Sequence, residues 1–351
     1  MIGCTATEER GERMAFEIGR GTNISHWLSQ SKSRGAQRRD WFTRADIERI
    51  AGWGFDHIRL PIDEEQMWDE SMRREEEAFD LLAGAIDWCA TNRIAVVLDL
   101  HILRSHYFND ADVPALYRDA GARERFAAIW SDLAGLVDDV PDDRLAVELL
   151  NEAVAPSAHV WNETWRVAYD AVRARSATRT IVLGSNNFNS YDTVSGLDVP
   201  ADPNLILTFH YYHPMFVTHH TAKWWRQGGS YAGPIRYPGR PIPESQHRAL
   251  EHLKDDGIEQ LNRDFDIDVM RRDMGLPRSV ADRTGHRLYC GEFGCYEHTP
   301  SDIREAWYRD VVAVFSELGI AWANWDYKGS FGLVDKNGQE TGVRRWLLEE
   351  R

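Results

Sequence analysis

The stretch RLAVELLNEAV, residues 144–154, sets an apolar run directly before two polar side chains. The residues from Leu145 to Leu150 are typical of a strand buried inside a protein, and the run continues without a break into Asn151 and Glu152. Apolar burial explains the strand, but it does not explain a carboxyl group at the point where the strand ends. The stretch therefore raises two questions: what covers the strand, and what Glu152 does at its end.

The same pattern recurs along the chain. Further strand-like segments are 55–62, 94–101, 180–185, 205–212, 286–294 and 320–327, with a weaker one near residue 21. Between most of them, apolar residues recur at helical spacing, for example in TRADIERIAGWG (43–54), EEEAFDLLAGAIDWCA (75–90), ERFAAIWSDLAGLVDD (124–139) and SDIREAWYRDVVAVFSELG (301–319). The alternation of strand and helix favours an α/β fold.

The strands are continuously apolar rather than alternating, which indicates burial on both faces and hence a parallel sheet covered by helices. Eight strand–helix units predict a single (β/α)₈ TIM barrel, and we expect one domain over residues 1–351 with the barrel at about 16–348. The interval 213–285 is out of step, because it is rich in Pro, Gly, Trp and charge before it turns polar and helical from about residue 244. We interpret it as a long functional insertion after the sixth strand.

Composition narrows the class of protein. The 351 residues carry a formal net charge of −15, which disfavours binding to nucleic acid, and no apolar run is long enough to predict a membrane span. The N-terminus lacks a recognisable signal peptide, so we expect a cytoplasmic protein, or a secreted one whose signal has been removed. The four cysteines are too sparse for a disulfide framework, although a Cys290–Cys295 bridge stays open. Oligomeric state is not indicated.

Polar and aromatic residues lie near the predicted carboxyl ends of the strands. They are Asn23, Arg59, His101, Asn151, Glu152, His210, Tyr212, Glu292 and Trp325. In a barrel these ends converge on one mouth, so residues far apart in the sequence become neighbours. Asp99, beside His101, is interpreted as a structural residue that pairs with backbone or an arginine inside the barrel.

Two carboxyl groups that face each other across a site are what cleavage of a glycosidic bond requires. Glu152 is the candidate general acid/base, and Glu292 is the candidate nucleophile. Tyr212 and Arg59 would keep Glu292 ionised, the first by donating a hydrogen bond and the second by its permanent charge.

Other candidates would bind the sugar itself. Asn151 is placed to bind the sugar 2-hydroxyl, a contact that strengthens in the transition state. Trp325 and Trp27 would offer flat apolar faces on which sugar rings stack.

Together these residues resemble glycoside hydrolase family 5, the cellulase family of retaining (β/α)₈ glycosidases. The motifs are GFDHIRLPI (54–62), VVLDLH (96–101), LLNEA (149–153), FHYYHPMFVTHH (209–220), CGEFG (290–294) and WANWDYKGSFGL (322–333). The resemblance implies a double displacement, with Glu152 as acid/base and Glu292 as nucleophile. It also places the family's arginine, histidines, asparagine, tyrosine and platform tryptophan on Arg59, His101, His210, Asn151, Tyr212 and Trp325. His220 stands where similar proteins often have Gln, a departure that bears on a substrate subsite.

The resemblance favours an endo-β-1,4-glucanase acting on β-linked oligo- or polysaccharide, without a cofactor. The alternative enzyme is an exo-acting β-glucosidase or β-mannosidase whose insertion closes one end of the cleft. A carbohydrate-binding barrel without activity would keep the aromatic platforms but should have lost a glutamate. A metal-dependent hydrolase is disfavoured because His101 and His210 lack a convincing third ligand, and an aldolase because Lys328 follows rather than ends its strand.

Overall fold

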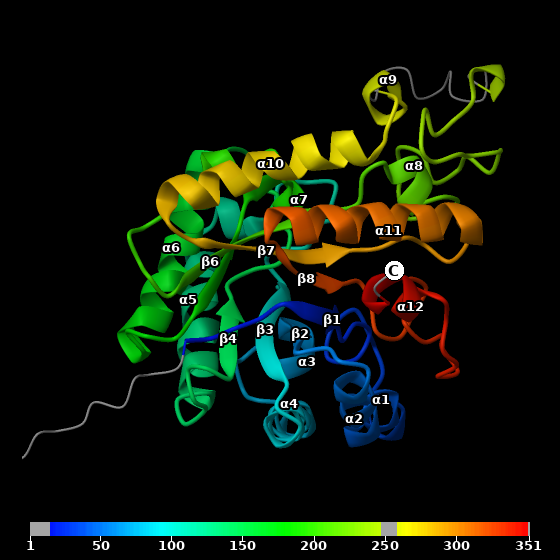
Figure 1. Cartoon of the computed structure of the whole chain (residues 1–351). Helices are drawn as coiled ribbons and strands as arrows, with labels where there is room; N and C mark the ends of the chain where they lie inside the picture. Colours follow the sequence, from blue (N-terminus) through cyan, green and yellow to red (C-terminus); the bar gives the residue numbers. More distant parts are fainter. Residues whose placement is uncertain (1–14, 247–257, 350–351) are drawn as a thin grey trace, which may run out of the picture.

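The computed structural model describes residues 15–246 and 258–349, and its centre is a closed barrel of parallel strands (Figure 1). In the described residues the strands are β1 (Arg20–Asn23), β2 (His57–Asp63), β3 (Ala95–Ile102), β4 (Leu145–Glu148), β5 (Ile181–Gly184), β6 (Leu205–Tyr211), β7 (Arg287–Phe293) and β8 (Ala321–Asn324). Each strand pairs with the next in the chain, and β8 closes the barrel by pairing with β1. The predicted (β/α)₈ fold is confirmed.

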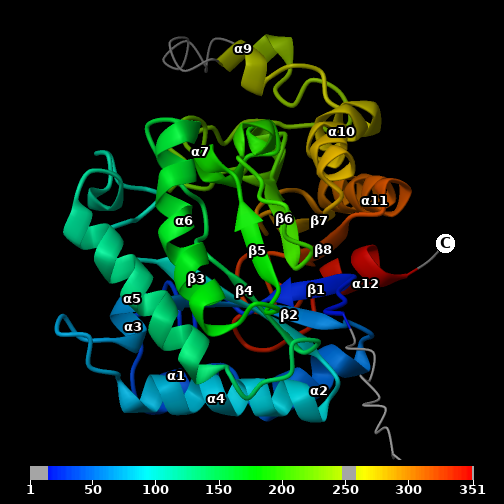
Figure 2. The same cartoon turned by 90° about the vertical axis from the view of Figure 1, so that its left-hand side faces the viewer.

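Helices surround the barrel on the outside (Figures 1 and 2). The α-helices are α1 (Ala36–Trp41), α2 (Arg44–Gly52), α3 (Glu64–Met67), α4 (Glu76–Thr91), α5 (Ala120–Leu136), α6 (Ala158–Arg175), α7 (Asn186–Asn189), α8 (Met215–Thr218), α9 (Ile258–Leu261), α10 (Ile267–Thr284), α11 (Ser301–Leu318) and α12 (Val343–Leu348). Two short 3₁₀ helices, η1 (Ala115–Tyr117) and η2 (Val194–Gly196), lie in the connections. The four segments with helical spacing correspond to α2, α4, α5 and α11. No helix within the described part of the chain is both long and apolar enough to span a bilayer.

Local sequence sets where the long helices begin and end. The Ser157 side chain accepts a hydrogen bond from the Val160 N–H at the start of α6, and Asp266 does the same for α10. Gly319 ends α11 with a φ of 61°, a left-handed conformation that glycine adopts without steric cost. These local signals set the first residue of α6 and α10 and the last residue of α11.

The barrel interior changes from apolar to charged along the strands. Val97 on β3 packs in an apolar floor with Phe16 and Ala146. Because side chains alternate along a strand, Asp99 and then His101 follow Val97 on the same inward face. The interior therefore carries a charged layer above the apolar floor, at the end where the strands finish.

The interval between β6 and β7 consists of two different parts. Helix α10 packs against α11 and β7, as the regular helix of a strand–helix unit does, so the excursion from the barrel ends before Ile267 rather than at residue 285. The excursion contains α8 and α9 and lies above the end of the barrel that carries α7 (Figure 2). The helix expected from about residue 244 falls partly on 247–257, outside the described residues.

Cys290 and Cys295 are both buried free thiols. The disulfide that the sequence left open is therefore not formed in this structure.

Candidate active site

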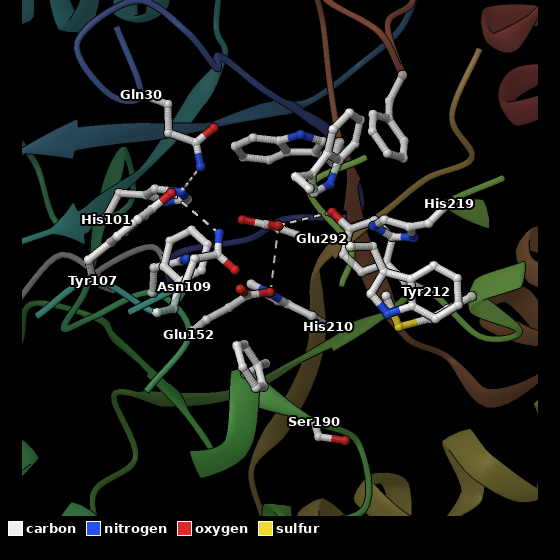
Figure 3. Close-up of a pocket in the computed structure, with 18 of the residues that line it drawn as sticks. Gln30, His101, Tyr107, Asn109, Glu152, Ser190, His210, Tyr212, His219 and Glu292 are labelled. Carbon is white, nitrogen blue, oxygen red and sulfur yellow. Dashed lines mark hydrogen bonds and ion pairs between the residues drawn. The ribbon is translucent and has the colours of Figure 1, made fainter. Parts of the chain in front are cut away.

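The two candidate carboxyl groups meet at the mouth of the barrel. Glu152 lies four residues beyond the end of β4, and Glu292 lies near the end of β7. One oxygen of each lies within 4.8 Å of the other and of a ring nitrogen of His210 (Figure 3). This separation matches the close pair of a retaining glycosidase rather than the roughly 6.5–9.5 Å of an inverting one.

Glu292 is held by two donors. The Arg59 Nη1 group donates to its Oε1 at 2.6 Å, and the Tyr212 hydroxyl donates to its Oε2 at 3.0 Å. Both contacts favour the ionised carboxylate. Glu152 has a different partner, because its Oε1 lies 2.9 Å from Nδ1 of His210.

The two carboxyl groups differ in proton affinity. Burial raises the pKa of Glu152 well above its usual value, and the negative charge of Glu292 reinforces the increase. Burial also raises the pKa of Glu292, but Arg59 and the Tyr212 hydrogen bond oppose that effect. When the pair holds a single proton, that proton therefore resides on Glu152.

Arg59 lies deeper in the barrel than the sequence suggested. The strand β2 continues to Asp63, so Arg59 sits within the strand rather than at its end, and its side chain is fully buried. From there its guanidinium reaches both Glu292 and the Asn151 side-chain oxygen, the latter at 2.8 Å. Arg59 therefore supports the two residues from beneath.

Sequence reasoning missed Glu148, which holds Arg59 in place. Both oxygens of Glu148 accept from Arg59, from Nε at 2.7 Å and from Nη2 at 2.9 Å. Asp99 adds an ion pair to Nη2 at 3.0 Å, in keeping with the structural role expected for it. The available signal was a glutamate in the middle of the otherwise apolar run that opens the sequence analysis.

His101 is held in one orientation by three neighbours. Its Nδ1 lies 2.7 Å from Asp99 Oδ2, so that nitrogen carries the proton and Nε2 accepts a hydrogen bond from the Gln30 amide at 3.1 Å. Its ring stacks on Trp325 with centroids 5.5 Å apart and an angle of 10° between the planes. Burial lowers the pKa of His101 to about 4, so the ring is neutral.

Two further predicted residues lie close to this network. Asn23 is fully buried, where its oxygen accepts from Arg59 and its amide donates to the Gly291 carbonyl. It supports the site without lining the cleft. Asn151 does line the cleft, and its amide nitrogen has no hydrogen-bond partner among the described residues.

The prediction that Trp27 binds sugar is wrong. Its side chain is fully buried, donates through Nε1 to the Arg38 carbonyl and packs on Phe42. The ring faces the core between the barrel and α1, so neither of its faces is available to a substrate.

Glu152 and Glu292 both line a cleft of about 920 Å³. Three aromatic side chains that line it are well exposed, namely Tyr107 at 38%, Phe188 at 44% and Trp224 at 52%. The neighbouring Trp225 also belongs to the lining, but its side chain is largely buried against Phe216 and anchors the excursion. From the HisHis pair of the excursion, His219 rather than His220 lines the cleft.

The same residues bear on the metal alternative. Glu152, His210 and Glu292 each offer one possible ligand atom, so His210 has carboxylate neighbours that the sequence did not reveal. His101 is not part of this group. A divalent cation here would compete with the Arg59 contact to Glu292 and with the His210 contact to Glu152.

Comparison with known proteins agrees with this geometry. Residues 20–330 match the family model described as cellulase, glycosyl hydrolase family 5. Endoglucanase C of Acetivibrio thermocellus is 30% identical over 317 residues, covering 88% of this chain and 90% of that protein. Cellodextrinase A of Ruminococcus flavefaciens is 28% identical, covering 87% of this chain and 84% of that protein.

Solved structures show the same fold. An endoglucanase superposes with a TM-score of 0.77 at 23% identity, covering 95% of this chain and 97% of its own. A hyperthermophilic endo-β-1,4-glucanase in complex with substrate gives the same TM-score at 21% identity, covering 95% of this chain and 97% of its own. On the family match and on relatives that it matches over most of their length, the chain belongs to glycosyl hydrolase family 5, the cellulase family, and is a glycoside hydrolase.

Proposed function

We propose that this hydrolase is a retaining endo-β-1,4-glucanase, with Glu152 as general acid/base and Glu292 as nucleophile. The observation that carries the proposal is the close approach of the two carboxyl groups, within 4.8 Å, in the lining of an aromatic cleft. An inverting enzyme needs a wider gap to admit a water molecule between carboxyl group and sugar. The names of the relatives support glucan as the substrate.

In the first step the Glu292 carboxylate attacks the anomeric carbon while Glu152 donates its proton to the departing glycosidic oxygen. The proton affinities described above put each group in the state that this step needs. In the second step the Glu152 carboxylate takes a proton from water, and the resulting hydroxide attacks the anomeric carbon and releases Glu292. The leaving sugar and the water thus use the same acid/base in turn.

The neighbours of the pair have defined tasks in this scheme. Arg59 and Tyr212 keep the nucleophile ionised and oriented. The Asn151 amide, which has no hydrogen-bond partner in the described part of the chain, would donate to the sugar 2-hydroxyl. Trp325, stacked on His101, would be the platform for the sugar that is attacked.

Exposed aromatic rings support action on long chains. Tyr107, Phe188 and Trp224 come from three different connections and line one cleft. Exposed aromatic rings are normally unfavourable on a protein surface, and in a cleft they offer stacking faces for several consecutive sugars. A polymer substrate would cover more of these rings than a disaccharide.

The second candidate is exo-action on short oligosaccharides. The Ruminococcus relative is named a cellodextrinase, and the excursion between β6 and β7 lines one side of the cleft through His219 and Trp224. An excursion that closed the cleft at one end would admit only chain ends.

The deciding experiment measures products on carboxymethyl cellulose, mixed-linkage β-glucan, mannan, and aryl β-glucoside and β-mannoside. Glu292→Gln serves as the blank, and proton NMR of the first-formed product reads its anomeric configuration. Endo-action predicts a rapid fall in viscosity with few reducing ends, and retention predicts a β-anomer first. Release of monosaccharide from unshortened polymer would establish exo-action, and an α-anomer would exclude the double displacement.

Activity that survives a chelator at millimolar concentration would eliminate the metal-dependent alternative, whereas loss that Zn²⁺ or Mg²⁺ restores would support it.

A further inference from the structure

Strand β7 contains a bulge directly before the proposed nucleophile. Phe209 of β6 pairs with Cys290, but the next residue, His210, pairs with Glu292. Gly291 is therefore the extra residue on β7 and has no partner residue on β6. Bulges are common beside active sites, where they change the direction in which side chains point. Here the bulge sets a residue without a side chain beside His210.

Two buried polar atoms flank the place that a side chain of residue 291 would occupy. A Cβ atom there would lie 3.0 Å from Oγ1 of Thr208 and 3.3 Å from Nε2 of His210. Both residues are buried, and neither atom has a hydrogen-bond partner within the described residues. Buried polar atoms are almost always paired, either with protein or with an ordered water molecule. One water molecule beside Gly291 would pair both atoms.

This position bears on which ring nitrogen of His210 carries a proton. Burial lowers the pKa of His210 well below its usual value, so the ring is neutral and has a single N–H. Nδ1 lies 2.9 Å from Oε1 of Glu152 (Figure 3). With the proton on Nε2, Nδ1 accepts from protonated Glu152; with the proton on Nδ1, that nitrogen donates to the Glu152 carboxylate. The first arrangement raises the pKa of Glu152 and the second lowers it.

We propose that a buried water molecule beside Gly291 accepts from Nε2 of His210 and donates to Oγ1 of Thr208, and that Thr208 thereby keeps the His210 proton on Nε2. Glu152 then finds an acceptor in Nδ1 and is held in the protonated form that an acid needs. Thr208 is fully buried, so it is a positioning residue that acts through His210. This inference rests on the proposed function, because it concerns the acid of the first step.

The other groups that act on Glu152 are independent of Thr208. Burial is the largest cause of its raised pKa, and the charges of neighbouring residues follow. These neighbours come from β2, β3, β7 and the residue after β6, and they are Arg59, Asp99, Glu292 and Tyr212. A substitution that removes only the Thr208 hydroxyl leaves all of them in place, so a change in the pKa of Glu152 would report the His210 proton.

The first test reads the proton directly. Long-range ¹H–¹⁵N NMR of the ¹⁵N-labelled wild-type protein at pH 6 distinguishes the two ring nitrogens of each histidine, and His210→Asn identifies the signal of His210. We expect the proton on Nε2. A proton on Nδ1 would overturn the proposal. This test needs neither substrate nor a Thr208 variant, so its result is independent of the proposed function.

The second test removes the hydroxyl. Thr208→Val keeps the shape of the side chain, and the His210 proton should move to Nδ1, where it stabilises the Glu152 carboxylate. Because this lowers the pKa of Glu152, the alkaline limb of kcat/KM for cellotetraose should move down by about one pH unit. Thr208→Ser is the matched control, because it keeps the hydroxyl, and its limb should stay within about 0.3 unit of the wild type.

An alkaline limb that stays in place in Thr208→Val would overturn the proposal. An equal shift in Thr208→Ser would do the same, because the hydroxyl would then not be the group that matters. If the wild-type protein cleaves no cellotetraose while NMR finds the His210 proton on Nε2, it is the proposed function that fails and the assignment of the proton that stands.

Discussion

At the scale of single residues, the guanidinium of Arg59 links the structural and the chemical parts of the site. Taken alone, the residue could either support the nucleophile or pair with an internal carboxylate. It does both, because its Nε and Nη2 groups donate to Glu148 and its Nη1 group donates to Glu292. Glu148 thereby orients the guanidinium that favours the ionised form of Glu292.

Replacement of Glu292 by Gln should lower kcat by a factor of at least about 1,000, because an amide cannot form the glycosyl–enzyme intermediate. Binding of cellotetraose, measured by isothermal titration calorimetry, should change by less than about tenfold, since the amide keeps the shape of the carboxyl group. A variant with full turnover would show that the nucleophile lies elsewhere.

Replacement of Glu152 by Gln should affect substrates according to their leaving group. Cleavage of cellotetraose should fall by roughly 100- to 10,000-fold, the usual contribution of a general acid, whereas formation of the intermediate from dinitrophenyl β-cellobioside should be largely retained. Glu152 must be protonated in this step and burial raises its pKa, so the wild-type rate falls as the pH rises through that pKa.

The Gln variant should therefore lose the alkaline limb of the pH profile. Pre-steady-state release of dinitrophenolate between pH 4 and 9 measures this. An alkaline limb that persists in the variant would assign the acid to another group.

At the scale of elements, the excursion between β6 and β7 contains two adjacent tryptophans with opposite environments. Trp225 is 8% exposed and packs on Phe216. Trp224 is 52% exposed and contacts Tyr296 edge to face, with ring centroids 4.9 Å apart. Tryptophans in a long loop can either anchor it or bind sugar. In the structure both rings belong to the cleft lining, but Trp225 is largely buried and anchors the excursion, whereas Trp224 is exposed.

This difference gives a matched pair of variants. Trp225→Ala should lower the free energy of unfolding by on the order of 3 kcal/mol, since it removes a large buried ring. Trp224→Ala should change it by less than about 0.5 kcal/mol but raise KM on carboxymethyl cellulose. Urea denaturation and steady-state kinetics measure the two effects, and equal destabilisation by both variants would contradict the assignment.

At the scale of the whole molecule, the charged layer joins strands from around the barrel. Arg59 on β2, Asp99 on β3, Glu148 on β4 and Glu292 on β7 meet in one buried group. Burial raises the pKa of Glu148 from 4.5 to about 7. Between these values the folded protein retains a proton that the unfolded chain has released, so this group lowers stability as the pH rises.

Glu148→Gln removes that dependence. The melting temperature of the variant relative to the wild type should therefore improve as the pH rises from about 4.5 to about 7, by the equivalent of on the order of 2 kcal/mol. Differential scanning calorimetry at several pH values measures it.

Glu77→Gln is the control for Glu148→Gln. Hydrogen bonds from Arg38 and Arg39 lower the pKa of Glu77 to about 2. The contribution of Glu77 to folding stability is therefore complete above about pH 4.5 and is lost only as the pH falls below that value. The difference in melting temperature between Glu77→Gln and the wild type should not change between pH 5 and 7. A flat difference for Glu148→Gln as well would show that its carboxyl group does not retain the proton.

The sequence by itself determined the order of strands and helices, the barrel, and the identity of the two carboxyl groups. Hydrophobic periodicity and strand ends are local properties, and a parallel barrel brings all strand ends to one mouth. The family match over residues 20–330 agrees with that pattern.

Only the tertiary structure decided the environment of each side chain. Trp27, Trp224 and Trp225 are the same residue type, yet Trp27 is in the core, Trp224 is exposed in the cleft, and Trp225 is largely buried and anchors the excursion. Contacts between segments distant in sequence likewise decide how deep Arg59 lies and how Glu148 binds it. They also hold the left-handed turn at Phe188. Burial and hydrogen-bond partners arise from such long-range packing, which no local pattern encodes.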